Sequence, residues 1–227
     1  MKNLEQIFCL IKFGSSEYNE KLLKEGELYF NTPIKYNELS GSENETGDNN
    51  EGAEWIENTQ LKKISVEHST TGELVLTPIP NSLSKIIQYN YYYLSYSLFV
   101  ISSRLFENTD KYQIDKKMLD MKNANSALMI KEPYKFINCI ISEIKKLGLQ
   151  YEAGIVEYKK LNCEGRIEIR PFDKKIEHQH QVEFRIVIEN KDNLPKKIYI
   201  GSIEDYCIIS SSKSMVETIW EAKRKVK

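Results

Sequence analysis

The segment 181-QVEFRIVIEN-190 alternates apolar and polar residues with the two-residue period of a β-strand. This period places Gln181, Glu183 and Arg185 together on one face of the strand. The opposite face is apolar and consists of Val182, Phe184, Ile186 and Ile188. One apolar and one polar face are typical of a strand in an antiparallel sheet that covers a core. The segment therefore predicts a sheet protein with its core on the Phe184 side.

The polar face of this strand has two interpretations. Gln181, Glu183 and Arg185 form either the solvated side of a half-exposed strand or a catalytic site. If the face is buried, Glu183 needs a partner, because an unpaired buried carboxylate is costly, and Arg185 could be that partner. His178 and His180 precede the strand, but no third ligand lies near them in the sequence. They therefore do not predict a metal site.

Local signals predict helices and further strands around this segment. Three helices are predicted, over residues 15–26, 133–148 and 213–227. Ser15 or Ser16 can cap the first helix and Gly26 can end it, while Pro133 suits the first turn of the second. Strands are predicted at 6–13, 27–32, 61–68, 73–80, 88–102, 154–160, 166–172 and 196–210. No internal repeat or linker divides them, so we expect a single α+β domain over 1–227, with a mostly antiparallel sheet and flanking helices.

The composition is that of a folded protein. Of the 227 residues, 41% are hydrophobic and 29% charged, which is enough apolar sequence to bury a core. No window approaches the roughly 18 uninterrupted apolar residues of a transmembrane helix, and Glu5 and Lys12 interrupt the apolar core that a signal peptide needs. We therefore expect a cytoplasmic protein. The net charge of −1 neither indicates nor excludes nucleic-acid binding.

The four cysteines lie singly in or beside apolar sequence. Their spacing matches neither a zinc site nor a disulfide framework. We expect buried thiols and no metal.

Residues 40–60 contain six acidic residues, no basic residue and three glycines. This composition predicts an acidic surface loop. The loop is either a solvated connector or a lid over a substrate site. In the second case, Asp48 and Glu51 are the residues expected to act.

The segment 88-QYNYYYLSYSLFVIS-102 contains five of the fourteen tyrosines. Its composition favours a long strand over a helix. A stripe of tyrosines is typical of core packing. The small residues Ser95 and Ser97 beside Tyr93, however, leave room for a planar ligand on one face.

Several segments together resemble a widespread family of uncharacterised bacterial proteins. Members of that family pair an N-terminal strand–helix–Gly–aromatic-strand unit with a C-terminal Gln/Glu-x-Glu-aromatic-Arg signature. The matching segments span most of the chain and are 10-LIKFGSSEYNEKLLKEGELYFNTPIKYNEL-39, 126-SALMIKEPYKFINCIISEI-144, 154-GIVEY-158, 172-FDKK-175, 181-QVEFRI-186 and 200-IGSIEDY-206. The family has no established activity to carry over.

Three motifs also resemble those of ADP-ribosyltransferases, which bind NAD between two small sheets. The strand 8-FCLIKFGS-15 with its following helix looks like the first motif, 93-YLSYS-97 like the second, and Gln181-x-Glu183 like the third. The resemblance implies an ADP-ribosyltransferase-like split sheet and a catalytic Glu183 that binds the nicotinamide ribose and supports an oxocarbenium-like transition state. Gln181 would help select the acceptor.

The first motif departs from the family pattern, because Lys12 and Ser15 stand where His or Arg is usual. Lys12 could hold a pyrophosphate as a point charge. The NAD-binding residues that the resemblance implies are Lys12, Phe13, Ser15, Tyr29, Tyr93 and Ser95.

Two classes of function are expected. The first is an NAD-dependent ADP-ribosyltransferase-like enzyme, a transferase or NAD glycohydrolase, serving as a bacterial toxin or anti-phage defence effector. It would use Glu183 with Gln181, Arg185 and Lys12. The alternative is a non-enzymatic nucleotide- or protein-binding module, a sensor or inhibitor in a phage–host conflict, that binds through residues 91–96 and the acidic loop. A nucleic-acid enzyme would need a basic groove, which the composition neither shows nor excludes.

Overall fold

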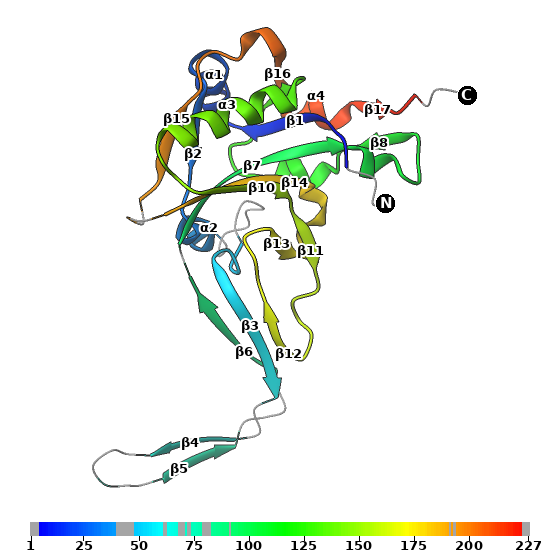
Figure 1. The fold of residues 1–227 in the computed structure, drawn as a ribbon. Helices are drawn as coiled ribbons and strands as arrows, with labels where there is room; N and C mark the ends of the chain where they lie inside the picture. The colour runs from blue at the N-terminus through cyan, green and yellow to red at the C-terminus, as the bar shows by residue number, and fades with distance from the viewer. Residues whose placement is uncertain are drawn as a thin grey trace.

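The computed structural model of the chain describes residues 5–39, 48–60, 63–67, 71, 74–78, 83–90, 92–190, 192 and 194–223. Its central element is a six-stranded sheet in the order β10–β14–β7–β1–β9–β16 (Figure 1). These strands are β10 (Tyr151–Ile155), β14 (Glu183–Glu189), β7 (Tyr93–Ser102), β1 (Ile7–Gly14), β9 (Ser126–Ile130) and β16 (Cys207–Ser211). All neighbours in this sheet are antiparallel. The fold is α+β with mostly antiparallel sheets, as the sequence predicts.

The two faces of the central sheet carry separate cores. On one face, Leu10, Leu98 and Phe184 belong to a core that includes residues of α1 (Ser16–Glu25), α3 (Pro133–Lys146), β2 (Glu27–Phe30) and β15 (Lys196–Tyr199). On the other face, Ile11 and Phe99 belong to a core with residues of η1 (Ser103–Phe106), η2 (Lys116–Asp120) and α4 (Ser212–Glu217). Both faces of β14 are consequently buried from Glu183 to Ile188. The half-exposed strand is therefore the wrong interpretation of this segment.

The predicted helix–Gly–strand unit near the N-terminus is confirmed. Ser15 caps α1 by accepting a hydrogen bond from the Tyr18 amide at 3.3 Å. Gly26 ends the helix in the left-handed region, at φ 65°. The chain then enters β2, which pairs with β15. The helix predicted at 133–148 is also confirmed, as α3.

A smaller sheet forms an arm at one end of the molecule, opposite α1 and α3 (Figure 1). It contains β3 (Ala53–Gln60), β6 (Leu83–Tyr89) and β12 (Gly165–Glu168), in the order β12–β3–β6. Beyond it, β4 (Lys63–Glu67) and β5 (Leu74–Pro78) form a hairpin. A short parallel pair, β11 (Glu157–Lys159) with β13 (Asp173–Lys175), lies between the arm and the central sheet. This pair carries Lys174, which reaches the site described below.

Several predicted boundaries differ from the structure. Residues 53–60 of the predicted acidic loop form β3, and residues 40–47 lie outside the described part of the chain. The predicted strand 88–102 is two strands, β6 and β7, and Tyr91 between them is not among the described residues. The predicted strand 196–210 is likewise divided into β15 and β16 by η4 (Glu204–Tyr206). The parts of the predicted strands 61–68 and 73–80 that lie outside β4 and β5 are not described.

The predicted closing helix over 213–227 is wrong. The helix α4 ends at Glu217, and Thr218 has an extended backbone with φ −69° and ψ 131°. The next residues form β17 (Ile219–Glu221), which pairs with β8 (Lys111–Gln113). The second half of the predicted helix therefore pairs as a strand with a distant segment. A local apolar pattern gives no indication of such a partner. Residues 224–227 lie outside the described ranges.

Further elements that were not predicted as such include α2 (Pro33–Leu39), β8, β9, β13, η1, η2 and the 3₁₀ turn η3 (Ile176–Gln181). Of the four cysteines, Cys9 is buried and Cys163 is exposed, while the other two are half-buried. The expectation of buried thiols is therefore wrong for Cys163. Among the helices of the described residues, none has the length and apolar character needed to span a bilayer.

Candidate functional site

Strand β14 and its neighbour β7 bring the predicted acid and base together. The register pairs Arg185 with Ser97, so these residues share a face with Glu183, opposite Phe184. Glu183 and Arg185 are only 5% and 2% exposed. The Arg185 Nε donates a hydrogen bond to Glu183 Oε1 at 2.7 Å, and the Ser97 hydroxyl donates to the same oxygen at 2.5 Å. The predicted Glu183–Arg185 pair is therefore present and buried.

Gln181 also lies at this site, but it is not part of the strand in which the periodicity places it. It lies in η3, and Val182 after it has φ 35° and ψ 63°, a left-handed conformation that is unusual for a β-branched residue. Lys174 of β13 joins the two residues of the motif. Its Nζ donates to Gln181 Oε1 at 2.6 Å and to Glu183 Oε2 at 3.1 Å. Lys174 was not predicted as a site residue, although it lies in one of the segments that carry the family resemblance.

The turn at residues 48–52 covers the other side of Arg185. The guanidinium binds Glu51 with two hydrogen bonds, Nη1 to Oε1 at 2.9 Å and Nη2 to Oε2 at 3.1 Å. The Tyr93 hydroxyl also donates to Glu51 Oε1, at 3.1 Å, and accepts from the Gly52 amide at 3.1 Å. Asp48 and Glu51 are buried. A solvated connector is thus the wrong interpretation for this part of the acidic segment.

These groups surround a cavity of about 70 Å³. At ~30 Å³ per water molecule, it has room for about two waters. Eight of its nine lining residues carry a polar group, and the full set is Tyr36, Asp48, Glu51, Ser97, Met121, Lys174, Gln181, Glu183 and Arg185. We call it the Glu183 cavity. Tyr36, which lies on α2, has no sequence signal that marks it as a site residue.

The two carboxyl groups that share Arg185 have opposite electrostatic environments. Burial would raise the pKa of Glu183, but the charges of Arg185 and Lys174 and the hydrogen bonds it accepts hold its pKa well below the ordinary value. Burial raises the pKa of Glu51, and the negative charges of Asp48 and Glu183 add to this rise, although Arg185 and Lys174 oppose it. Carboxyl groups with pKa values pushed apart can take different roles, one ionised throughout and the other able to exchange a proton.

Glu183 is also held through its backbone. Its amide donates a hydrogen bond to the Tyr158 hydroxyl at 3.0 Å. Tyr158 lies on β11, next to the β13 strand that carries Lys174. This contact was not predicted, because the residues are far apart in sequence and lie on strands of different sheets.

The central sheet splits beside the Glu183 cavity. Pairing of β1 with β7 ends at Ile11 and Phe99, while β1 continues along β9 to Gly14. The Nζ of Lys12 then donates to the Ser97 carbonyl at 2.8 Å. Lys12 thus takes the place of a strand hydrogen bond where β1 and β7 diverge.

A second cavity, of about 260 Å³, lies on the opposite face of this split, and we call it the Lys12 cavity. Its lining consists of Lys12, Gly14, Tyr18, Asn19, Leu22, Glu27, Tyr29, Asn31, Tyr36 and Tyr96. The Lys12 ammonium lies 4.3 Å from the centre of the Tyr96 ring. Burial lowers the pKa of Lys12 to about 8, although the charge of Glu183 opposes this shift. Tyr36 lines both cavities, which are therefore neighbours.

The other predicted NAD-binding residues have varied places. Tyr29 lines the Lys12 cavity, and Tyr93 holds Glu51. Ser95 is buried and pairs through its backbone with Asn31. Phe13 packs edge-to-face on Phe99, with ring centroids 6.0 Å apart, and Ser15 caps α1. Phe13 and Ser15 line neither cavity.

Within the described ranges, no group of three or more His, Cys, Asp or Glu side chains is arranged to hold a metal ion. No protein-family model matches the chain, and neither a curated protein nor a solved structure matches it. The case for a function therefore depends on the chemistry of these two neighbouring cavities.

Proposed function

We propose that the protein is an ADP-ribosyltransferase-like enzyme that cleaves the bond between nicotinamide and ribose in NAD. The observation that carries this proposal is the meeting of three segments, 8–15, 93–97 and 181–183, at one place. The first two belong to β1 and β7, and the third runs from the end of η3 into β14; the strands β14, β7 and β1 are adjacent in that order in the central sheet. An ionised Glu183 lies where they meet, and the divergence of β1 from β7 supports the expected split sheet.

Glu183 is suited to stabilise positive charge on the ribose. When the bond between C1′ and the nicotinamide nitrogen breaks, its electron pair leaves with nicotinamide, which departs neutral and needs no proton. Positive charge develops at C1′ and the ring oxygen, as in glycoside hydrolysis. A carboxylate that stays ionised and is fixed by Arg185 and Lys174 provides preorganised stabilisation of that charge.

The geometry favours water as the acceptor, and thus an NAD glycohydrolase. The Glu183 cavity has room for about two waters, and Glu51 and Tyr36 enclose it. In the proposed reaction, a water oxygen forms the new bond to C1′. Its proton passes to Glu51, whose raised pKa suits it to accept one. The products are ADP-ribose and nicotinamide.

The nicotinamide ribose is larger than the Glu183 cavity, so binding of NAD requires the turn at 48–52 to move outward. The return of this turn would bring Glu51 back to the ribose. The Lys12 cavity offers the adjoining space, with an ammonium for the pyrophosphate and the rings of Tyr18, Tyr29 and Tyr96 for the rest of the dinucleotide. Consumption of cytoplasmic NAD would make the protein a toxin or an anti-phage defence effector.

The second candidate is a non-enzymatic nucleotide-binding module, a sensor or inhibitor. The complete pairing of Glu183 by Arg185, Lys174 and Ser97 favours it, because a fully satisfied carboxylate can be purely structural. This candidate predicts stabilisation of the fold by NAD without release of nicotinamide.

A comparison of two glutamate variants tests the proposal. Glu183→Gln preserves the shape of the side chain but removes its charge, so nicotinamide release should fall by about 10²–10³-fold. Glu189→Gln is the matched control. Glu189 lies at the other end of β14, where it accepts a hydrogen bond from the Gln150 amide at 3.3 Å. Its variant should retain wild-type release, and circular dichroism should show both variants folded. Equal release by Glu183→Gln and the wild type would contradict the proposal, and NAD binding without release would favour the second candidate.

A further inference from the structure

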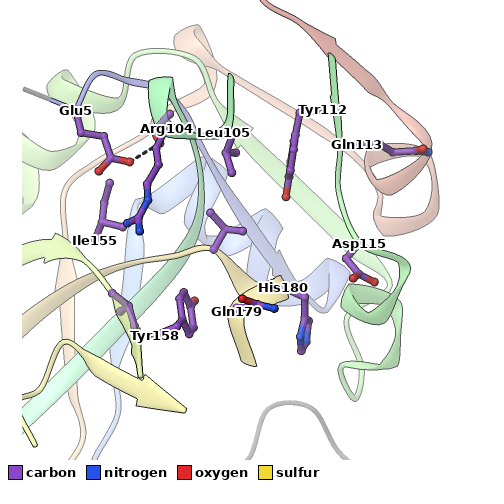
Figure 2. Close-up of a pocket in the computed structure, with 13 residues that line it drawn as sticks. Glu5, Arg104, Leu105, Tyr112, Gln113, Asp115, Ile155, Tyr158, Gln179 and His180 are labelled. Atoms are coloured by element: carbon purple, nitrogen blue, oxygen red, sulfur yellow. Dashed lines mark hydrogen bonds between the residues drawn. The ribbon is translucent and has the colours of Figure 1, made fainter. Parts of the chain in front are cut away.

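A third cavity, of about 550 Å³, has no part in the reaction proposed above. It lies among the N-terminal segment, η1, β8, the β10–β11 segment and η3 (Figure 2). Its volume is within the range of about 300–1,000 Å³ typical of small-molecule sites. We propose that this cavity binds a small molecule made of a planar heteroaromatic ring and one anionic group, as in a nucleoside monophosphate.

Arg104 provides the charge that would recognise the anion. Figure 2 shows its guanidinium directed into the cavity beside Ile155. The guanidinium makes no hydrogen bond or ion pair with the described residues. A guanidinium free to form two parallel hydrogen bonds suits a phosphate or carboxylate group.

The two acidic residues of the cavity lining already have donors. Glu5 Oε1 accepts a hydrogen bond from the Ser102 hydroxyl at 2.6 Å. Asp115 Oδ1 accepts from the Lys117 amide at 2.9 Å, as the cap of η2. Neither carboxylate is paired with Arg104. The guanidinium therefore remains available to an anionic ligand.

The walls of the cavity suit a planar ring. Tyr112 lies on one side of the space, and Tyr158 and Gln179 lie on the other (Figure 2). Apolar contact comes from Leu105, Ile155, Val156 and Val182. Phenol rings and aliphatic side chains pack on the faces of an aromatic ring, and an amide can bind its polar edge. This combination favours a nucleobase over an aliphatic acid.

The cavity also borders two residues that hold the backbone of Glu183. Tyr158 lines the large cavity, and its hydroxyl accepts the hydrogen bond from the Glu183 amide. Val182, with its left-handed backbone, lines it as well. Its two neighbours in the chain, Gln181 and Glu183, line the Glu183 cavity, and residues with strained backbones are often found at functional sites. A ligand in contact with Tyr158 and Val182 would touch both residues that position the Glu183 backbone.

Isothermal titration calorimetry of the full chain with AMP, adenosine and ribose 5-phosphate tests the site. AMP should bind, and removal of either its phosphate or its base should weaken binding. Arg104→Ala should weaken AMP binding by about tenfold or more, as the loss of a charge-assisted hydrogen bond predicts, and should leave adenosine binding unchanged. Arg166→Ala is the matched control, because Arg166 is an exposed arginine on β12, outside the cavity lining.

Three results would overturn the inference. One is the absence of AMP binding to the wild type, and another is equal affinity of the wild type and Arg104→Ala for AMP. The third is loss of AMP binding in Lys12→Met with Arg104→Ala unaffected, which would place the nucleotide in the Lys12 cavity. Because the titration measures binding alone, its result is independent of whether NAD is cleaved.

Discussion

Replacement of Arg185 by Met tests whether the buried charges form one interdependent cluster. The guanidinium binds Glu183 at 2.7 Å and Glu51 at 2.9 and 3.1 Å, and it also donates to the Pro171 carbonyl. Met fills part of the space without charge, so two carboxylates that are each 5% exposed lose their shared cation. Removal of one partner from a buried ion pair costs about 3–5 kcal/mol. We expect a loss of unfolding free energy in that range at pH 8.

The pH dependence of this loss gives a second test. In the wild type, the pKa of Glu183 is lower in the folded than in the unfolded chain. Its stabilising contribution is therefore fully present above the ordinary pKa of a glutamate, and it is lost as the pH falls from that value through the lower folded pKa. Without Arg185, the folded carboxyl groups should take up protons at higher pH, so the deficit should shrink as the pH is lowered from 8 to about 5.5.

Urea unfolding, monitored by tryptophan fluorescence at both pH values, measures this deficit. Arg104→Met is the control, since Arg104 is exposed and a surface substitution of this kind should change stability by no more than about 0.5 kcal/mol. A loss below about 1 kcal/mol for Arg185→Met, or a deficit that grows as the pH falls, would refute the reasoning.

Three further predictions concern the N-terminal unit. Gly26→Ala should destabilise the protein by about 1–3 kcal/mol in urea unfolding, because φ is 65° and a Cβ would lie 2.1 Å from the Gly201 carbonyl oxygen; an unchanged midpoint would contradict this. Ser15→Ala removes the cap on the Tyr18 amide and should lower the unfolding free energy by about 1 kcal/mol, so a stabilised variant would show that the cap is unimportant. The pKa of Lys12 is about 8 in the folded protein against an ordinary 10.5. Between these pH values the unfolded chain binds more protons at Lys12 than the folded protein does, so the unfolding free energy of the wild type should rise as the pH increases from 8 to 10.5. Lys12→Met should lack that gain, and parallel pH profiles of the two proteins would refute the assignment.

The elements that the sequence predicts well are those with local causes. The serine cap and Gly26 bound α1, and Pro133 with a regular apolar stripe marks α3. The prediction of the closing helix is wrong because its last apolar residues, Ile219 and Trp220, lie in the strand β17. The partner of this strand, β8, is about a hundred residues away. A short stretch of sequence gives no indication that it pairs with such a distant segment.

The candidate site shows the same limit. Periodicity correctly puts Glu183 and Arg185 on one face, and burial makes them partners. Glu51 lies 134 residues from Arg185, in a segment whose acidity predicts exposure. Its burial follows from the guanidinium it binds. Lys174 likewise becomes a site residue only through the placement of β13, which brings its ammonium between Gln181 and Glu183.

The most direct test of the central claim is a time course of nicotinamide release from NAD by the purified protein. The account predicts release in proportion to protein concentration, with one ADP-ribose formed per nicotinamide, and its loss in Glu183→Gln. No nicotinamide from the folded wild-type protein, or the same rate from wild type and Glu183→Gln, would contradict it.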